Sequence, residues 1–184
     1  MKCNWMVVSN KLDCNEDMFY LNESPLLQIK ETKDLGVLFN SKLNFSEHIS
    51  AIIGKAKQRI FFIRKSFASS ASDALILAFK IYVLPIFDYC SQVWSPHCHL
   101  DIARLESVQR MFTKRLKSFE NLSYQERLKR AGLCSLERRR LMADLVLTYK
   151  ILHGLTIIDL DLQLDNNGKT RGHPWKLKLP KAKH

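Results

Sequence analysis

Paired carboxylates are the first residues to test for catalysis, because two-metal phosphoryl transfer needs acidic side chains that hold two ions about 3.5–4 Å apart. The sequence contains two close pairs, Glu16-Asp17 and Asp159-x-Asp161. Neither pair stands beside a histidine or at the end of a convincing strand. The sequence also lacks a glycine-rich phosphate loop, a G-x-S-x-G turn and a His-Glu-x-x-His helix. We therefore predict no catalytic residue in this chain.

Residues that could bind a metal gather in the segment CSQVWSPHCHL. The candidates are Cys90, His97, Cys98 and His99. Zinc sites usually pair their ligands at two- to four-residue spacing in two separate knuckles, whereas three of these residues are adjacent and cannot easily face one ion. A polar loop between two helices explains the segment better. We predict no metal site and no cofactor in this chain.

Cysteine usage and hydropathy bear on the location of the protein. The five cysteines are odd in number, irregularly spaced and without a C-x-x-C pair, and no secretory signal is evident at the N-terminus. This pattern favours a reducing compartment, so we expect an intracellular protein of the nucleus or cytoplasm that is not secreted. The most apolar tract, residues 74–94, is interrupted by Lys80, Pro85 and Asp88. We predict a buried, kinked helix there, and no membrane partner.

The positive charge of the chain is concentrated in one part of it. The formal net charge is +11, but residues 1–47 carry 5 basic and 7 acidic groups, whereas residues 104–150 carry 12 basic and 5 acidic groups. A concentrated positive segment favours polyanions, of which nucleic acid is the commonest, because binding releases counterions. The alternative explanation is that the charge only keeps the protein soluble.

The elements expected to position these charges change in type near residue 44. Residues 1–40 have the alternation and turn signals of short strands, with a turn at 22–25 and a strand over 35–39. The motif Asn44-x-x-Glu47 resembles a capping box. An isoleucine-rich helix comes next, and Lys55 and Arg59, four residues apart, share one flank of it.

Further helices are predicted over about 72–84, 101–117 and 136–153. Ser70-x-x-Asp73 is a start signal for the first of them, which Pro85 should end or kink. A capping box at Ser123-x-x-Glu126 and a helix end at Gly132 are expected between the last two. The final helix is expected to bury its apolar stripe, Leu141, Leu145, Tyr149 and Leu152. The fold class is therefore α+β, with a short β-hairpin or strand segment at the N-terminus and a mainly helical bundle after it.

Basic residues of the 101–117 helix are further candidates for binding nucleic acid. At about 100° per residue, Arg110, Lys114 and Lys117 lie together on the side opposite the apolar stripe. A solvated helix face is an equally good explanation of these three residues alone. In the run Arg138-Arg139-Arg140, three consecutive side chains point in different directions, and at least one is expected to form an ion pair, for example Arg140 with Asp144.

Six segments, taken in order, resemble one family of proteins. They are KDLGVLFNSKLNFSEHI, KAKQRIFFIRKSF, YVLPIFDYCSQVWSPH, RLESVQRMFTKRL, LSYQERLKRAGLCSLERRRLMADLVLTYKILHG and TRGH. Together they resemble the C-terminal part of the reverse transcriptases of non-LTR (LINE-type) retrotransposons, in the jockey-like group. The resemblance covers roughly residues 1–175. The segments after Asp101 are characteristic of these elements and not of polymerases in general.

The resemblance implies a division of the chain. Residues 1–43 would be the end of the palm with a primer-grip-like hairpin, 44–100 thumb-like helices, 101–155 a basic helical region, and 156–184 a loop and basic tail.

The resemblance also implies roles for particular residues. Asp34, Leu35 and Gly36 would form the primer grip, where glycine allows close approach of the backbone to the primer end. Lys55 and Arg59 would contact the backbone of the template–primer duplex, since an RNA–DNA hybrid offers a wide, shallow minor groove. The expected partner is RNA or an RNA–DNA hybrid. No small-molecule substrate is expected for this segment alone.

The chain also departs from the family pattern. The polymerase signature, an aromatic residue followed by x-Asp-Asp, is absent from the sequence, as are the fingers, most of the palm and the endonuclease. The apolar segment that comes after TRGH in the family is absent as well. We expect a truncated remnant or partial gene product that lacks the catalytic aspartates, so that the Mg²⁺ of the intact polymerase has no site here. The alternative is a domesticated helical module that binds protein through its apolar surfaces.

Overall fold

The computed structural model describes residues 3–9, 18–67, 71–158, 164 and 176–178 of the 184-residue chain. The carboxylate pairs Glu16-Asp17 and Asp159-x-Asp161 and the start signal at Ser70 lie outside these residues, in whole or in part. The chain forms two compact units, Met1–Arg140 and Leu141–His184.

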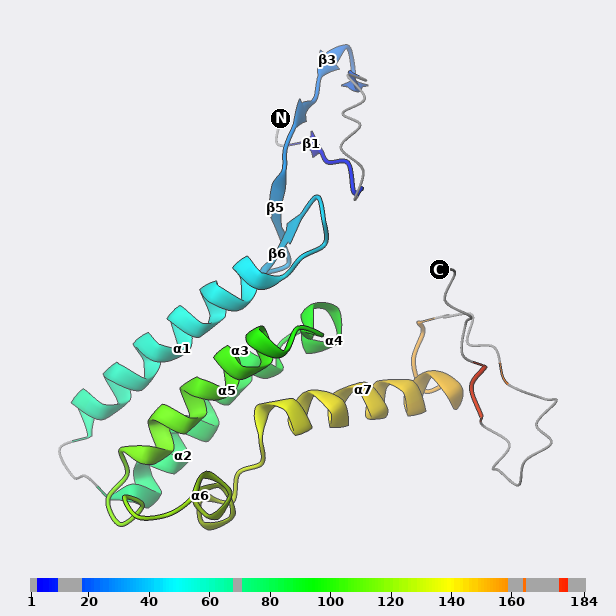
Figure 1. Ribbon diagram of the computed structural model, residues 1–184. Helices are drawn as coiled ribbons and strands as arrows, with labels where there is room; N and C mark the ends of the chain where they lie inside the picture. Colours follow the sequence, from blue (N-terminus) through cyan, green and yellow to red (C-terminus); the bar gives the residue numbers. More distant parts are fainter. Residues whose placement is uncertain (1–2, 10–17, 68–70, 159–163, 165–175, 179–184) are drawn as a thin grey trace. The chain divides into compact units, whose positions relative to one another are not determined.

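The first unit begins with short strands (Figure 1). Strand β1 (Asn4–Trp5) pairs in parallel with β4 (Leu27–Gln28). Strands β2 (Tyr20–Leu21) and β3 (Ser24–Pro25) pair antiparallel, and β5 (Glu31–Asp34) pairs antiparallel with β6 (Val37–Asn40). The predicted turn at 22–25 is confirmed.

Helices make up most of the chain after β6. In the described part of the chain they are α1 (Ser46–Ser66), α2 (Ser72–Tyr82), α3 (Leu84–Asp88), α4 (Ser91–Trp94), α5 (His99–Lys114), α6 (Tyr124–Ala131) and α7 (Leu136–Leu152). The α+β fold class, with strands first and helices after, is confirmed. No helix among the described residues combines the length and apolar character needed to cross a membrane.

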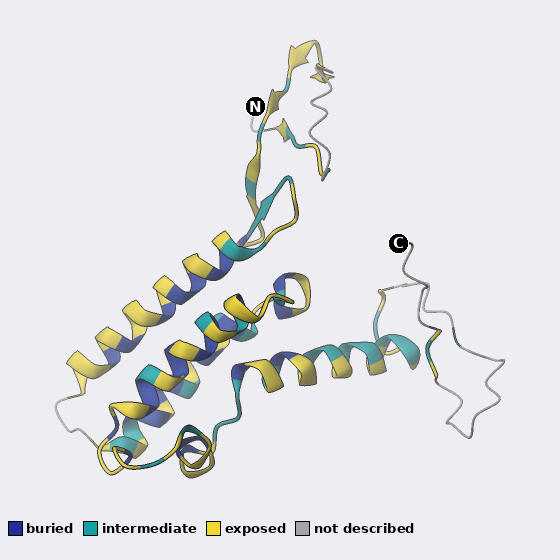
Figure 2. Ribbon diagram, viewed as in Figure 1, coloured by how far each residue is buried: buried dark blue, intermediate teal, exposed yellow. Residues whose placement is uncertain are grey.

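The core of the first unit lies between α1, α2, α3 and α5, and the buried sides of α1 and α5 are visible in Figure 2. The predicted apolar stripe of α1 is buried from Ile49 to Ile63, whereas Phe67, just after the helix, is 41% exposed. At the centre, the rings of Phe79 and Phe112 stack with their centroids 4.2 Å apart. Neither phenylalanine is accessible to solvent. Helices α2 and α5 therefore meet through this buried ring pair.

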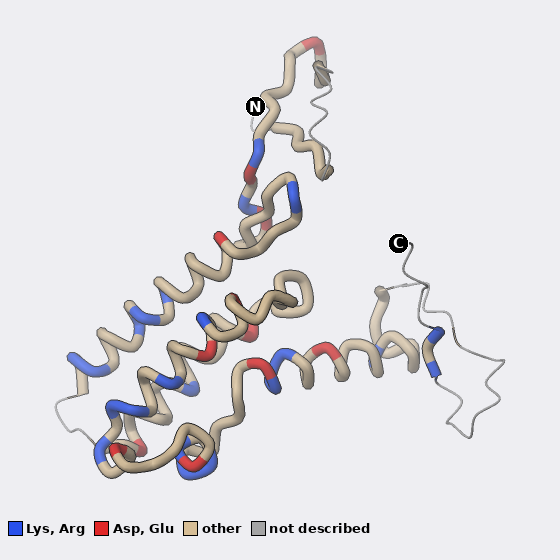
Figure 3. The backbone as a smooth tube through the Cα atoms, viewed as in Figure 1, with Lys and Arg blue, Asp and Glu red and all other residues tan. Residues whose placement is uncertain are grey.

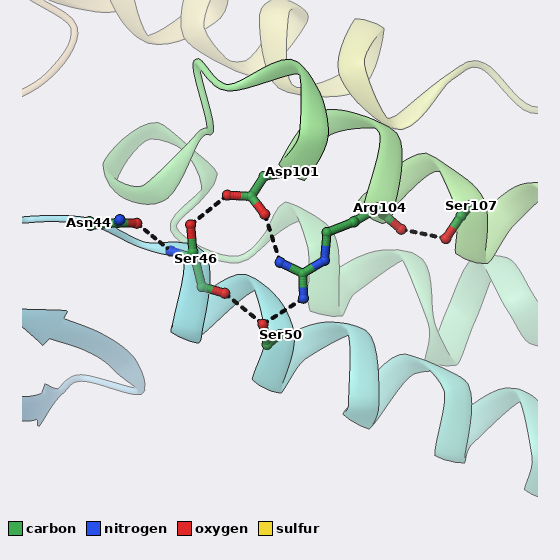
Figure 4. Close-up of polar contacts among 6 residues, drawn as sticks. All are labelled: Asn44, Ser46, Ser50, Asp101, Arg104 and Ser107. Atoms are coloured by element: carbon green, nitrogen blue, oxygen red, sulfur yellow. Dashed lines mark hydrogen bonds and ion pairs between the residues drawn. The ribbon is translucent and has the colours of Figure 1, made fainter.

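A polar network closes the α1–α5 interface at one end, as Figure 4 shows. The Ser46 hydroxyl donates to the carboxylate of Asp101 at 2.6 Å, and the Arg104 guanidinium donates to the same carboxylate at 2.8 Å. A second guanidinium nitrogen of Arg104 donates to Ser50 Oγ at 2.7 Å. Because Asp101 is buried and both its oxygens accept hydrogen bonds, the network fixes the start of α5 against the start of α1.

Helix boundaries follow local chemistry where the sequence signal is strong. Pro85 stands in the first turn of α3, where its missing N–H costs nothing. The capping box of α6 is complete, with Ser123 and Glu126 each accepting from the other's backbone N–H. Gly132 ends α6 with φ +58°, in the left-handed region. These three predictions are confirmed.

Two other boundary predictions are wrong. The Asn44-x-x-Glu47 capping box does not form, because α1 begins at Ser46 after the N-cap residue Phe45, which leaves Asn44 one position too early. The Asn44 side chain instead accepts a hydrogen bond from the Ser46 N–H at 2.9 Å. Helix α5 ends at Lys114, so Lys117 lies beyond it.

The predicted burial of the α7 stripe is also wrong. Leu141, Leu145 and Tyr149 are 57%, 64% and 57% exposed, while Leu152 is half-buried. The helical period indicates which side of a helix is apolar, but not whether another element covers that side. In the second unit the ring of Tyr149 lies 4.2 Å from that of His153, and Leu164 and Leu177 form an isolated antiparallel bridge.

Candidate nucleic-acid interface

The β5–β6 hairpin turns at Leu35 and Gly36. Asp34 pairs with Val37, which leaves a two-residue loop between the strands. Both loop residues have positive φ, +44° for Leu35 and +90° for Gly36, as in the type I′ turns that match the twist of a hairpin. The expected strand over 35–39 is therefore corrected, because it begins only at Val37. The strands β5 and β6 thus form a tight β-hairpin.

Leu35 is an unusual residue for the tip of a turn. Its side chain is 81% exposed, and a leucine with positive φ costs about 1–3 kcal/mol unless the surroundings compensate. The compensation comes from α3 and the residue after it, where the Tyr89 hydroxyl donates to the Leu35 carbonyl at 2.6 Å. Trp94, fully buried, in turn donates from Nε1 to the Tyr89 carbonyl at 2.8 Å. The exposed turn is thus anchored to the helical core.

His48 joins the same hairpin to α1. Its Nδ1 accepts a hydrogen bond from the Leu38 N–H at 3.3 Å, and its ring lies 5.5 Å from that of Trp94. The residue is only 4% exposed. Burial, and secondarily the charge of Lys33, lowers the pKa of His48 below its ordinary value of 6.5. The neutral imidazole therefore holds the hairpin in place.

Acidification should weaken the fold through His48. Because the folded pKa lies below the unfolded value, the stabilising contribution is complete above about pH 6.5 and is lost as the pH falls through the folded pKa. We expect the melting temperature to fall between about pH 7.5 and pH 5. A His48→Gln variant, whose amide does not titrate, should show a smaller fall when both are measured by circular dichroism. An equal fall in both proteins would contradict this role of His48.

A surface pocket of about 360 Å³ lies beside the turn. It is lined by Lys33 and Gly36 of the hairpin, His48, Ile52 and Lys55 of α1, and Pro85, Ile86 and Tyr89. Its charged lining residues, Lys33 and Lys55, are both cations, and no Asp or Glu lines it. The structure therefore brings the predicted residues Gly36 and Lys55 together at one pocket.

Three other residues predicted to bind nucleic acid are close in sequence to residues that line this pocket. Asp34 and Leu35 belong to the same turn, and Arg59 is exposed one helical turn beyond Lys55. The positions of Lys and Arg along α1 can be followed in Figure 3.

Only two of the three basic residues predicted to share one side of α5 belong to that helix. Arg110, Lys114 and Lys117 are all exposed, but Lys117 comes after the helix, and its carbonyl accepts a hydrogen bond from the Ser72 hydroxyl at 3.0 Å. Arg110 lies over the ring of Tyr124, 4.6 Å from its centroid. The common helical face expected for the three residues is therefore wrong, because α5 is shorter than predicted.

Arg110 stands above a buried hydrogen-bond network. The carboxylate of Glu106 accepts from the Tyr124 hydroxyl and, at 2.9 Å, from the Leu136 N–H. Gln109 donates to the Cys134 carbonyl at 2.9 Å. Burial, and then the hydrogen bond to Glu106, raises the pKa of Tyr124 well above its ordinary value. The network ties α6 and the start of α7 to α5.

The arginine run contains an ion pair, as expected. The Nε of Arg139 donates to the carboxylate of Asp88 in α3 at 3.0 Å. Asp88 is far away in sequence, so the i,i+4 spacing used for the prediction could not indicate it.

Side chains that could bind a metal do not gather in the part of the chain that the structure describes. Among the residues that the structure describes, no three His, Cys, Asp or Glu side chains gather where they could hold an ion. This holds for the segment with Cys90, His97, Cys98 and His99, all of which are described. The described residues therefore do not fit the Mg²⁺ of a polymerase.

Comparison with known proteins adds a distant likeness. An uncharacterized protein of Caenorhabditis elegans is 24% identical over 127 residues, which cover 67% of this chain and 64% of that protein. A probable RNA-directed DNA polymerase from transposon X-element of Drosophila melanogaster is 26% identical over 93 residues, which cover 49% of this chain and 10% of the polymerase. No family model matches the chain, and no solved structure matches it.

The second of these matches supports a distant likeness to a transposon RNA-directed DNA polymerase. The chain spans less than two thirds of the nematode protein and about a tenth of the polymerase.

The sequence reasoning missed the residues that hold the hairpin in place. Tyr89 bonds to the turn, Trp94 bonds to Tyr89, and His48 bonds to Leu38 of β6, yet His48 is far from the other two in sequence. For His48 a signal existed, because it lies four residues before Ile52 on the apolar side of α1. No comparable local pattern marks Tyr89.

Proposed function

We propose that this chain is the primer-grip and thumb part of a jockey-like non-LTR reverse transcriptase, and that it binds the backbone of an RNA–DNA hybrid. The observation that carries the proposal is the pocket beside the β5–β6 turn, where a rigidly held glycine turn meets Lys33 and Lys55. Gly36 adopts a φ of +90° without strain, which shapes the tight turn beside the two lysines. The two lysines supply charge for phosphates on the same side.

The proposal assigns a role to each part of the chain. Residues 1–43 present the grip through Asp34, Leu35 and Gly36, and residues 44–100 supply the thumb-like helices with Lys55 and Arg59. Residues 101–155 form a basic helical region in which Arg110, Lys114 and Lys117 add weaker phosphate contacts. Residues 156–184 are a basic tail. The distant likeness to a transposon RNA-directed DNA polymerase supports this assignment.

Replacing both Lys55 and Arg59 by alanine should weaken binding to an RNA–DNA hybrid about tenfold or more at about 100 mM salt. Each lost phosphate contact removes about 0.7–0.9 from the slope of log K against log salt, so the slope should become shallower by up to about 2. Fluorescence anisotropy with a labelled hybrid measures both quantities. The matched control is Lys57→Ala with Lys65→Ala, two exposed cations of the same helix that do not line the hairpin-side pocket. Unchanged affinity and slope in the first variant would reject the assignment.

A second candidate function is a helical module that binds protein. It is favoured by one observation, the exposed apolar side chains of α7, Leu141, Leu145 and Tyr149. Exposed apolar patches often mark protein interaction sites. Binding through such a surface should change little as salt rises, whereas a nucleic-acid site loses affinity steeply. A salt titration of any captured partner therefore distinguishes the two functions.

A further inference from the structure

A second pocket lies on α1 away from the hairpin. Its volume is about 530 Å³, within the range of about 300–1,000 Å³ typical of ligand sites. It is lined by Lys57, Ile60, Phe61, Arg64 and Lys65 of α1, by Met111 of α5 and by Arg115 just after α5. Four of the seven lining residues are cations, and none is Asp or Glu.

The two pockets use opposite flanks of the same helix. At about 100° per residue, Lys57 and Arg64 lie roughly half a turn around α1 from Lys55 and Arg59, with the buried isoleucines between them. The hairpin-side pocket is completed by α3, whereas this one is completed by α5. The two pockets therefore open on different sides of α1.

The lining combines an aromatic ring with positive charge. Phe61 is 62% exposed although it lines the pocket, and its ring meets that of Phe62 edge to face, with centroids 5.9 Å apart. An exposed phenylalanine ring offers an apolar face on which any nucleobase can stack. Lys57 and Lys65 lie four residues before and after Phe61, so each is close to the ring on the helix surface.

One of the cations is held in place by the protein. Arg64 Nη1 donates to the Arg115 carbonyl at 3.2 Å, which joins the last turns of α1 to the end of α5. The backbone carbonyls at a helix C-terminus repel anions, so the guanidinium also masks one of these carbonyls. Four like charges around one pocket repel one another, and a polyanion relieves that repulsion.

We propose that this pocket binds single-stranded nucleic acid, with one base stacked on Phe61 and adjacent phosphates held by Lys57, Arg64, Lys65 and Arg115. The chemistry recognises the π-face of a base and the backbone charge, so binding is independent of sequence. The site goes beyond the hybrid contact proposed above and does not depend on it. It would hold an unpaired strand while a duplex occupies the hairpin side.

The test is the affinity of the full chain for a labelled oligothymidylate of about 12 nucleotides, measured by fluorescence anisotropy. Phe61→Ala should weaken binding about five- to 150-fold, because a base stacked on an aromatic ring contributes about 1–3 kcal/mol. Phe61→Trp should restore it. The matched control is Phe62→Ala, which removes a neighbouring ring that is 52% exposed and does not line the pocket. Because both phenylalanines are more than half exposed, all three variants should fold, which their melting curves check.

A second pair of variants tests the charges and separates the two sites. Lys57→Ala should reduce oligothymidylate affinity and flatten its salt slope by about 0.7, whereas Lys55→Ala should not. With an RNA–DNA hybrid as the ligand, Lys55→Ala should reduce the affinity and Lys57→Ala should not. Failure of hybrid binding with intact oligothymidylate binding rejects the proposed function alone. Equal effects of Phe61→Ala and Phe62→Ala, or no oligothymidylate binding by the wild-type chain at low salt, overturn the single-strand site.

Discussion

Replacing Phe112 by alanine is expected to lower the free energy of unfolding by about 3–5 kcal/mol. Phe112 is inaccessible to solvent and stacks on Phe79 at the centre of the first unit. Alanine removes the stacked ring and leaves a cavity between α2 and α5, which the surrounding helices can fill only partly. Aromatic pairs also contribute about 0.5–1.5 kcal/mol beyond the area they bury. Urea denaturation followed by circular dichroism measures the change.

A matched control for this substitution is Phe62→Ala. Phe62 is 52% exposed on α1, so its loss should change the free energy of unfolding by less than about 1 kcal/mol. If the Phe112 variant lost no more stability than this control, the core described between α1, α2 and α5 would be wrong.

Replacing Glu106 by alanine is expected to cost about 2–4 kcal/mol of stability. Its carboxylate accepts from the Tyr124 hydroxyl and from the Leu136 N–H, and the substitution leaves both donors without their acceptor. A buried donor that loses its partner costs about 1–3 kcal/mol. Because this network positions α6 and the start of α7, we also expect protease sensitivity to rise there.

Two further substitutions make the Glu106 result specific. Glu106→Gln keeps the shape and one acceptor oxygen, so it should lose about half as much stability as Glu106→Ala. Glu137→Ala removes an exposed carboxylate in the first turn of α7 and should cost less than about 1 kcal/mol. A Glu106→Ala variant as stable as the Glu137 variant would contradict the network.

Local signals in the sequence predicted much of the fold. The capping box at Ser123 and Glu126, the glycine at 132 and Pro85 each act through backbone atoms a few residues away. The apolar period of α1 likewise indicates its buried side without knowledge of its partners. These predictions succeed because their physical causes lie within one or two helical turns.

Predictions that depended on distant partners succeeded less often. The leucines of α7 have the period of a buried stripe, yet Leu141 and Leu145 are exposed. The residues 35–39 have an alternating pattern that predicted a strand, but Leu35 and Gly36 form a turn, and Tyr89, 54 positions away in sequence, bonds to Leu35 there. Lys117 was assigned to a helix that ends at Lys114.

The sequence predicted some residues of the two pockets and missed others. Lys55 and Gly36 were both selected from the sequence, and the structure brings them to one pocket. The pocket around Phe61 was not predicted, although Lys57 and Arg64 are seven residues apart and so share a helix side. The signal was ambiguous because α1 is basic on both flanks, and only the packing of α5 separates them.

The central claim is that the chain binds an RNA–DNA hybrid through its phosphates. It is tested most directly by the affinity of the wild-type chain for a labelled hybrid between about 50 and 200 mM salt. We predict measurable binding at low salt and a plot of log K against log salt with a slope of about −2 or steeper, since Lys33, Lys55 and Arg59 each contribute. A chain that does not bind the hybrid at low salt, or whose affinity does not change with salt, would contradict the claim.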